Sequence, residues 1–256
     1  MGVSFPRLER GPQRTAKYHG DRMSVLAIIP AAGTGIRMGG ATPKQFLSLE
    51  GVPIFVHTLR KFAASEAIDE IFLGVRPEEM DRAFQEIAKE NFSKPVRVLA
   101  GGASRMETVA RCLDQAAPET DVVVVHDAVR PFVELAMISQ IVDASRADGA
   151  VILAIPSVDT VKKVERHLIT GTIPRERIVL AQTPQAFRYA LLRQAYDRAL
   201  AEGYYGTDES SLVEHDGHDV RVLMGSDRNI KITKPSDLPL ARLYIAQERE
   251  SVRDGA

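Results

Sequence analysis

The sequence of 256 residues has almost no cysteine: Cys112 is its only one. A single thiol cannot form a disulfide within the chain, and it cannot supply a metal site built from several cysteines. Its neighbours Val109, Ala110 and Leu113 are apolar, which favours a buried core thiol over a reactive one. This cysteine usage is typical of a reducing compartment, and we expect the protein in the cytoplasm.

Long apolar runs and an excess of one charge are also missing. No stretch approaches the roughly 20 apolar residues that a membrane-spanning helix needs. The formal net charge of -1 gives no overall positive field for nucleic acid, although a few focused cations could still bind a small anion. We therefore expect neither a membrane nor a nucleic acid as partner.

The first 22 residues are basic and lack the apolar segment of a secretory signal. We interpret residues 1–22 as a flexible extension, with Met23 as an alternative start of the protein. Apolar residues make up 45% of the chain, which is ample for a large core. Residues 23–250 are therefore expected to form one domain.

From Ser24 onward, short β-branched runs alternate with segments of helical period. The runs are continuously apolar, which indicates strands buried on both faces of a parallel sheet. This alternation predicts an α/β fold, a Rossmann-like three-layer sandwich with a mostly parallel central sheet. The predicted strands are Val25–Ile29, Ile68–Val75, Val96–Leu99, Asp121–Val125, Ala150–Ile155, Val220–Met224 and Asn229–Thr233. The predicted helices are Ile54–Ala64, Pro77–Glu90, Ser104–Ala117, Glu134–Arg146, Tyr189–Glu202, Asp208–His215 and a last helix from Pro235.

Residues 157–178 interrupt this alternation. Two polar, β-prone halves flank a Thr-Gly-Thr turn at Thr170–Thr172, which predicts a β-hairpin that projects from the domain as an arm. Neither half has the apolar surface of a core strand, and an isolated hairpin is marginally stable in water. The arm therefore requires a partner surface.

A segment rich in small residues, Pro30–Leu47, follows the first predicted strand. Small side chains let backbone N–H groups approach an anion closely, and Arg37 and Lys44 add two cations. The segment lacks the Gly-Lys-Ser/Thr of a P-loop. It also lacks the third glycine of dinucleotide-binding proteins, because Met38 stands there. Taken alone, the segment predicts phosphate binding and no particular ligand.

The pattern Ala-Ala-Gly-x-Gly-x-Arg-Met, followed by Pro-Lys-Gln, resembles the signature of nucleotidyltransferases that activate sugars and polyols. Further motifs follow in order: Gly101–Thr108, His126–Pro131, Asp159–Lys162, Thr183–Gln185, Thr207–Glu209 and Asn229–Thr233. Together they resemble the 2-C-methyl-D-erythritol 4-phosphate cytidylyltransferase family. The resemblance implies CTP and a polyol phosphate as substrates, release of pyrophosphate, and Mg²⁺ as cofactor.

The resemblance also implies roles for residues that match the family's motifs. The expected catalytic cations are Arg37, Lys44, Arg175 and Lys231. CTP is expected to contact Ala31, Ala32, Gly33, Thr34, Gly35, Gly102, Arg105, Thr108 and Asp127, and the segment from Gly102 to Thr108 is expected to recognise cytosine. The acceptor is expected to contact Asp127, Arg130, Asp159, Thr160 and Thr183. Asp127 is the one residue expected to bind the metal, which is held mainly by the CTP phosphates.

In this family the projecting arm crosses to a second subunit. The resemblance therefore implies a homodimer, in which Thr160 and Arg175 complete the neighbouring site.

Three other functions stay open at this point. Ribitol 5-phosphate cytidylyltransferases share the fold, CTP and most motifs, although the Thr-Val-Lys run after Asp159 favours the methylerythritol branch. A sugar-1-phosphate nucleotidyltransferase would use UTP or GTP. A catalytically silent nucleotide-binding regulator would have no need of Arg37, Lys44 and Lys231 together.

Overall fold

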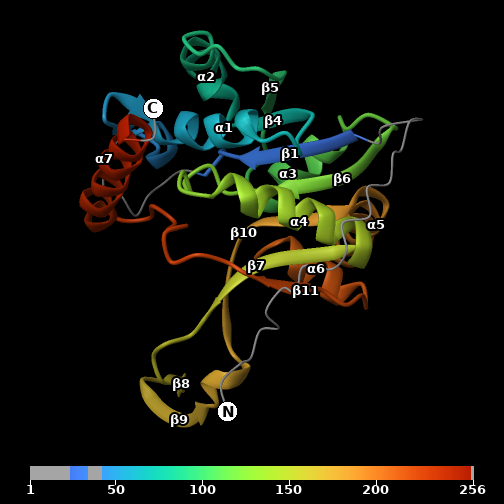
Figure 1. Ribbon diagram of the computed structural model, residues 1–256. Helices are drawn as coiled ribbons and strands as arrows, with labels where there is room; N and C mark the ends of the chain where they lie inside the picture. The colour runs from blue at the N-terminus through green and yellow to red at the C-terminus, as the bar shows by residue number, and fades with distance from the viewer. Residues whose placement is uncertain (1–23, 34–41, 255–256) are drawn as a thin grey trace, which may run out of the picture.

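The computed structural model describes residues 24–33 and 42–254, which form a seven-stranded sheet with helices on both faces (Figure 1). The strand order is β11-β7-β10-β6-β1-β4-β5. The strands are β1 (Ser24–Pro30), β4 (Glu70–Val75), β5 (Val96–Ala100), β6 (Thr120–Val125), β7 (Ala150–Pro156), β10 (Val179–Arg188) and β11 (Arg221–Met224). All neighbouring pairs are parallel except those of β10, which is antiparallel to β6 and β7. The predicted mostly parallel α/β sheet is confirmed.

Alternating side chains of the strands supply two cores, one on each face of the sheet. In β1, Ala27 and Ile29 face one core, whereas Leu26 and Ile28 face the other. The first core is covered by α1 (Ile54–Ala64), α2 (Met80–Ile87) and α4 (Leu135–Asp148). The second is covered by α3 (Arg105–Leu113), α5 (Tyr189–Glu202) and α6 (Glu209–His215). This is the predicted three-layer sandwich, and each of these helices overlaps a predicted one.

A third apolar cluster fixes the last helix, α7 (Leu238–Asp254), against the loops around the sheet. Ala241 and Ile245 of α7 pack with Val129, Phe132 and Ile232. Short elements complete the described fold: η2 (Lys44–Phe46), β2 (Ser48–Leu49), β3 (Val52–Pro53), η3 (Pro77–Glu79), η4 (Arg175–Arg177) and η5 (Pro235–Asp237). No helix in the described part of the chain is both long and apolar enough to cross a membrane.

Cys112 lies on α3 and is fully buried in the second core. Burial raises the pKa of its thiol to about 12, so the thiol stays protonated and unreactive at neutral pH. The prediction of a core cysteine is confirmed.

Strand β10 is absent from the sequence-based prediction. Its middle carries Gln182, Thr183 and Gln185, which break the apolar pattern, and its register with β7 shifts between Gln182 and Gln185. These polar side chains are nevertheless buried, because they form hydrogen bonds with backbone groups of the neighbouring loops and of the start of α6. Apolar patterning alone could not identify such a strand.

The predicted strand Asn229–Thr233 is wrong, because this segment has no strand structure. The N–H of Ile232 donates to the carbonyl oxygen of Val129, but no ladder continues from that bond in the described residues. Asn229 instead donates through its side chain to the carbonyl oxygen of Thr183, at 2.8 Å. Side-chain contacts thus take the place of the backbone pairing that β-propensity suggested.

The arm is a separate two-stranded sheet of β8 (Val161–Glu165) and β9 (Leu168–Ile173), which projects from the main sheet (Figure 1). The predicted turn at Thr170–Thr172 is wrong, because Gly171 pairs with Lys163 inside the ladder. The chain reverses at Arg166 and His167, whose φ angles of 46° and 69° are both positive. Two such residues suit the twist of a tight hairpin.

Candidate active site

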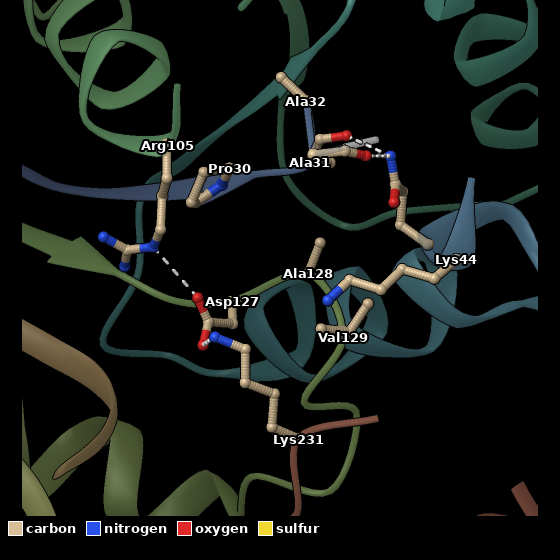
Figure 2. Close-up of a pocket in the computed structure, with 11 residues that line it drawn as sticks. Pro30, Ala31, Ala32, Lys44, Arg105, Asp127, Ala128, Val129 and Lys231 are labelled. Atoms are coloured by element: carbon tan, nitrogen blue, oxygen red, sulfur yellow. Dashed lines mark hydrogen bonds and ion pairs between the residues drawn. The ribbon is translucent and has the colours of Figure 1, made fainter. Parts of the chain in front are cut away.

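The order of the strands reverses at the neighbouring pair β1 and β6. From β1 the chain passes to β4 and then to β5 on one side, and it returns to β6 on the other side of β1. Ligands of open α/β sheets bind at such a reversal, beyond the carboxyl ends of the strands. The segments that follow β1 and β6 line one pocket here, as Figure 2 shows. Its lining residues are Pro30, Ala31, Ala32, Gly33, Lys44, Gln45, Arg105, Asp127, Ala128, Val129 and Lys231.

The predicted phosphate cradle begins where β1 ends. Gln45 fixes its backbone, since Nε2 donates to the carbonyl oxygens of Ala31 at 2.6 Å and Gly33 at 3.1 Å. The loop after β5 packs against the cradle: a Cβ at Gly101 would lie 2.8 Å from the Cβ of Ala32, so only glycine fits there.

Several predicted cradle residues, Thr34, Gly35 and Arg37, lie outside the described residues. Lys44 is described, and it extends into the pocket from the side opposite Arg105 (Figure 2). The structure therefore brings Lys44 of the cradle together with Asp127 and Lys231 in one pocket.

Asp127 is the only acidic side chain among the described residues that line this pocket. Its Oδ2 lies 2.8 Å from Nζ of Lys231 and 3.4 Å from Nε of Arg130, and its Oδ1 lies 3.2 Å from Nε of Arg105. Burial by itself would raise the pKa of Asp127, but the nearby positive charges outweigh it and hold that pKa well below its usual value. Asp127 is therefore ionised at neutral pH.

The backbone around Asp127 is fixed by two further contacts. Its N–H donates to Oγ1 of Thr183 at 3.0 Å. Nε2 of His126 lies 2.9 Å from the carbonyl oxygen of Arg130. Burial lowers the pKa of His126 to about 4, so the ring is neutral and its Nε2 carries the proton that this contact needs. His126 and Thr183 thus hold the loop that presents Asp127.

Arg130 holds the backbone next to Lys231, because it forms a hydrogen bond with Asn229, two residues earlier in the chain. Nη1 of Arg130 donates to the carbonyl oxygen of Asn229 at 2.7 Å, which fixes the segment that carries Lys231. Arg130 is buried and is not among the residues that line the pocket. Its role toward the acceptor stays a prediction.

The predicted cytosine-binding segment begins α3, where Ser104 caps the helix by accepting from the N–H of Glu107. Arg105 lines the pocket, whereas Gly102 and Thr108 do not. The Thr108 hydroxyl donates to the carbonyl oxygen of Ser104 at 2.8 Å and accepts from the N–H of Gly102 at 3.0 Å. Thr108 thereby shapes the loop, and base recognition by this segment stays a prediction.

The predicted arm residues are not brought to the pocket of their own chain. Asp159, Thr160 and Arg175 are exposed, and Arg175 donates through Nη1 to the carbonyl oxygen of Val158 within the arm. Figure 1 shows β8 and β9 projecting away from the carboxyl ends of β1 and β6.

A metal site built from protein side chains alone is absent from the described residues, which contain no group of three or more His, Cys, Asp or Glu that could hold an ion. Asp127 alone offers a carboxylate within the described pocket. This donor set fits Mg²⁺ bound mainly to substrate phosphates, because Mg²⁺ often takes one or two carboxylates beside them.

Two residues at the site carry no role in the sequence-based prediction. Gln45 holds the cradle, and Glu209 accepts from Nη1 of Arg105 at 2.7 Å. Both lie inside the motifs that carry the family resemblance, so their position was a usable signal. Their roles could not be inferred from the sequence, because each residue acts through a hydrogen bond to a residue in another segment of the chain.

A family model described as 2-C-methyl-D-erythritol 4-phosphate cytidylyltransferase matches residues 25–247. A protein of that name from Acidobacterium capsulatum is 49% identical over 235 residues, covering 88% of this chain and 98% of the relative. Another from Solibacter usitatus is 47% identical over 237 residues, covering 88% of this chain and 97% of the relative.

Solved structures that are similar to this chain come from the same family. A structure from Anaerococcus prevotii, described as 4-diphosphocytidyl-2C-methyl-D-erythritol synthase, has a TM-score of 0.77 and 32% identity, covering 87% of this chain and 96% of that one. A 2-C-methyl-D-erythritol 4-phosphate cytidylyltransferase from Thermus thermophilus has a TM-score of 0.71 and 33% identity, covering 87% and 98%. The resemblance inferred from the motifs is confirmed, and the chain belongs to the 2-C-methyl-D-erythritol 4-phosphate cytidylyltransferase family.

Proposed function

We propose that this protein transfers the cytidylyl group of CTP to 2-C-methyl-D-erythritol 4-phosphate, with release of pyrophosphate. Membership of a family of cytidylyltransferases supports this reaction. The observation that carries it is the pocket at the carboxyl ends of β1 and β6, where the described lining residues include three cations, Lys44, Arg105 and Lys231, and one carboxylate, Asp127. This excess of positive charge suits a triphosphate beside a phosphate monoester.

The reaction needs positioning more than acid–base chemistry. A phosphate oxygen of the acceptor forms a bond to the α-phosphorus of CTP, and the bond from that phosphorus to the bridging oxygen of pyrophosphate breaks. The acceptor phosphate is largely a dianion near pH 7, so it needs no strong base to become a nucleophile. Lys44 and Lys231 would hold the two polyanions together and stabilise the charge on the α-phosphoryl oxygens as the transition state forms.

Mg²⁺ is part of this proposal. Asp127 would hold it together with the phosphates of CTP, in keeping with the single carboxylate of the described pocket. The ion would neutralise part of the triphosphate charge. Asp127 meanwhile fixes the ammonium group of Lys231 through their 2.8 Å ion pair.

The arm extends the proposal to a homodimer. Its apolar side chains Val164, Leu168 and Ile169 are 59%, 71% and 66% exposed, an arrangement that a second copy of the chain would cover. In such a dimer Thr160 and Arg175 would reach the acceptor bound by the neighbouring subunit. Cys112, a buried thiol without a disulfide, suits the cytoplasm as the place where this dimer works.

The proposal is tested by measuring pyrophosphate release from CTP, UTP, GTP and ATP in the presence of Mg²⁺. Each nucleotide is paired with 2-C-methyl-D-erythritol 4-phosphate and, separately, with ribitol 5-phosphate. We expect turnover with CTP and the methylerythritol phosphate. Turnover with ribitol 5-phosphate alone, or with UTP or GTP in place of CTP, would contradict the proposal.

A further inference from the structure

The motif Thr207–Glu209 lies beside the pocket without lining it. Glu209 is the first residue of α6 and is only 1% exposed. Its Oε1 accepts from Nη1 of Arg105 at 2.7 Å and from the hydroxyl of Tyr196 at 3.0 Å. A carboxylate buried in this way is costly unless a nearby cation compensates its charge. Arg105 is that cation, and it also lines the pocket.

Hydrogen bonds between the motifs Thr183–Gln185 and Thr207–Glu209 hold Glu209 in place. Asp208 caps α6 by accepting from the N–H of Ser211, and its other oxygen accepts from Nε2 of Gln185 at 2.7 Å. Oε1 of Gln185 in turn accepts from the N–H of Ser210 at 3.1 Å. Gln185 pairs across the sheet with Val125, the last residue of β6, two residues before Asp127. The start of α6 is therefore fixed relative to the loop that presents Asp127.

Arg105 stands between two carboxylates. Its Nη1 lies 2.7 Å from Oε1 of Glu209, and its Nε lies 3.2 Å from Oδ1 of Asp127. Asp127 already faces Lys231 and Arg130, so it is shared among three cations. Glu209 makes the shorter contact with Arg105. Without the charge of Glu209, the guanidinium of Arg105 would be attracted to Asp127 alone.

We propose that Glu209 is a positioning residue for nucleotide binding: its charge shares the guanidinium of Arg105 with Asp127 and so holds Arg105 at the pocket wall. Asp127 thereby stays paired with Lys231 and available to the substrates. This inference rests on the proposed function, because it takes CTP as the ligand of the pocket. Glu209 itself touches no substrate, so its effect passes through Arg105.

The test is Glu209→Gln, which keeps the shape of the side chain and an oxygen for Arg105 and Tyr196 but removes the charge. An interaction that serves binding in the ground state and the transition state alike changes KM more than kcat. We therefore expect the KM for CTP to rise about tenfold while kcat changes less than about threefold. Glu214→Gln on the exposed side of the same helix is the matched control, expected to keep the original KM for CTP.

The same substitution in an Arg105→Met background separates positioning from a general structural role. If Glu209 acts through Arg105, Glu209→Gln should then change the KM for CTP by less than about twofold, since coupled residues are non-additive. Glu209→Asp retains the charge and should recover part of the lost affinity, and thermal unfolding of each variant checks the fold. An equal rise in KM in both backgrounds, or an unchanged KM in Glu209→Gln, would overturn the inference.

The failure of this inference is distinguishable from failure of the proposed function. An active unsubstituted protein whose KM for CTP is insensitive to Glu209→Gln rejects the role of Glu209 alone. An unsubstituted protein that neither binds CTP in calorimetry nor releases pyrophosphate from it rejects both.

Discussion

The pocket and the arm differ in how far a single chain buries their apolar side chains and pairs their charges. At the pocket, Asp127 and the neighbouring Arg130 behind the pocket wall are 6% and 9% exposed, and their charges are paired within the chain. On the arm, Leu168 and Ile169 are 71% and 66% exposed, and Figure 1 shows β8 and β9 extending away from the sheet. One region is assembled by its own fold, whereas the other presents surface that a folded monomer leaves in water. This difference is what the proposal expects of a pocket that binds a nucleotide and an arm that binds a second subunit.

The largest effect should come from Lys44→Ala, which removes a cation from the pocket side of this comparison. Loss of one group that stabilises charge in the transition state should lower kcat about 10²- to 10³-fold. Thermal unfolding should change little, because Lys44 lies in a short 3-10 element at the pocket and outside both apolar cores. Steady-state kinetics measure this, with exposed Lys89→Ala as control. An unchanged kcat would remove Lys44 from the mechanism.

Substitutions in the arm should instead weaken the proposed dimer. Replacing Leu168 and Ile169 together by Asp places charges in the expected dimer interface. Each apolar side chain contributes about 1.5–3 kcal/mol when buried, so the Kd of the dimer should rise at least ~100-fold. Analytical ultracentrifugation measures it, with Leu200→Asp on α5, 52% exposed, as the control. A wild-type chain that is monomeric, or a double variant that dimerises as well as the control, would contradict the proposed interface.

A smaller effect concerns the pH dependence of the protein's free energy of unfolding. His126 has a folded-state pKa of about 4, because burial lowers it from 6.5. Between these values the unfolded chain binds more protons than the folded one, so the free energy of unfolding falls as pH falls. For this group the loss from pH 7 to pH 5 is about 2 kcal/mol. Asp127, whose folded-state pKa is depressed, adds its own loss only at lower pH, near and below its usual value.

The variant His126→Gln keeps a donor for the carbonyl oxygen of Arg130 but cannot titrate. Urea unfolding at pH 7 and pH 5 should therefore show a smaller pH dependence for this variant than for the original protein. The same dependence in both proteins would show that His126 is not the group responsible.

The sequence was most informative where one physical signal dominated. Apolar runs and helical periods placed β1, β6, α1 and α5, because these elements bury continuous apolar surface. The strand β10 was missed, because its Gln182, Thr183 and Gln185 are buried for their hydrogen bonds and not for apolar contact. The arm was predicted as a hairpin, but its turn was misplaced, since Arg166 and His167 adopt positive φ without a glycine.

The residues of the site likewise fall into those that the sequence indicated and those that only the structure shows. Motifs pointed to Lys44, Asp127 and Lys231, and the fold brings these three into one pocket. The contact of Arg105 with Glu209 joins residues 104 positions apart, and no local pattern in the sequence indicates it. Pairing of these buried charges depends on the fold bringing the first residue of α3, Arg105, next to the first residue of α6, Glu209, which only the three-dimensional arrangement supplies.

Mixing two inactive variants tests most directly whether the acceptor site is shared between subunits. Lys44→Ala damages the pocket, and Arg175→Ala damages the arm that would serve the neighbouring pocket. In a mixed dimer one site receives both changes and the other receives neither. Since half of the dimers are mixed after random exchange, pyrophosphate release should recover to about a quarter of the unsubstituted activity. No recovery, with subunit exchange verified by native mass spectrometry, would contradict a site completed by the second subunit.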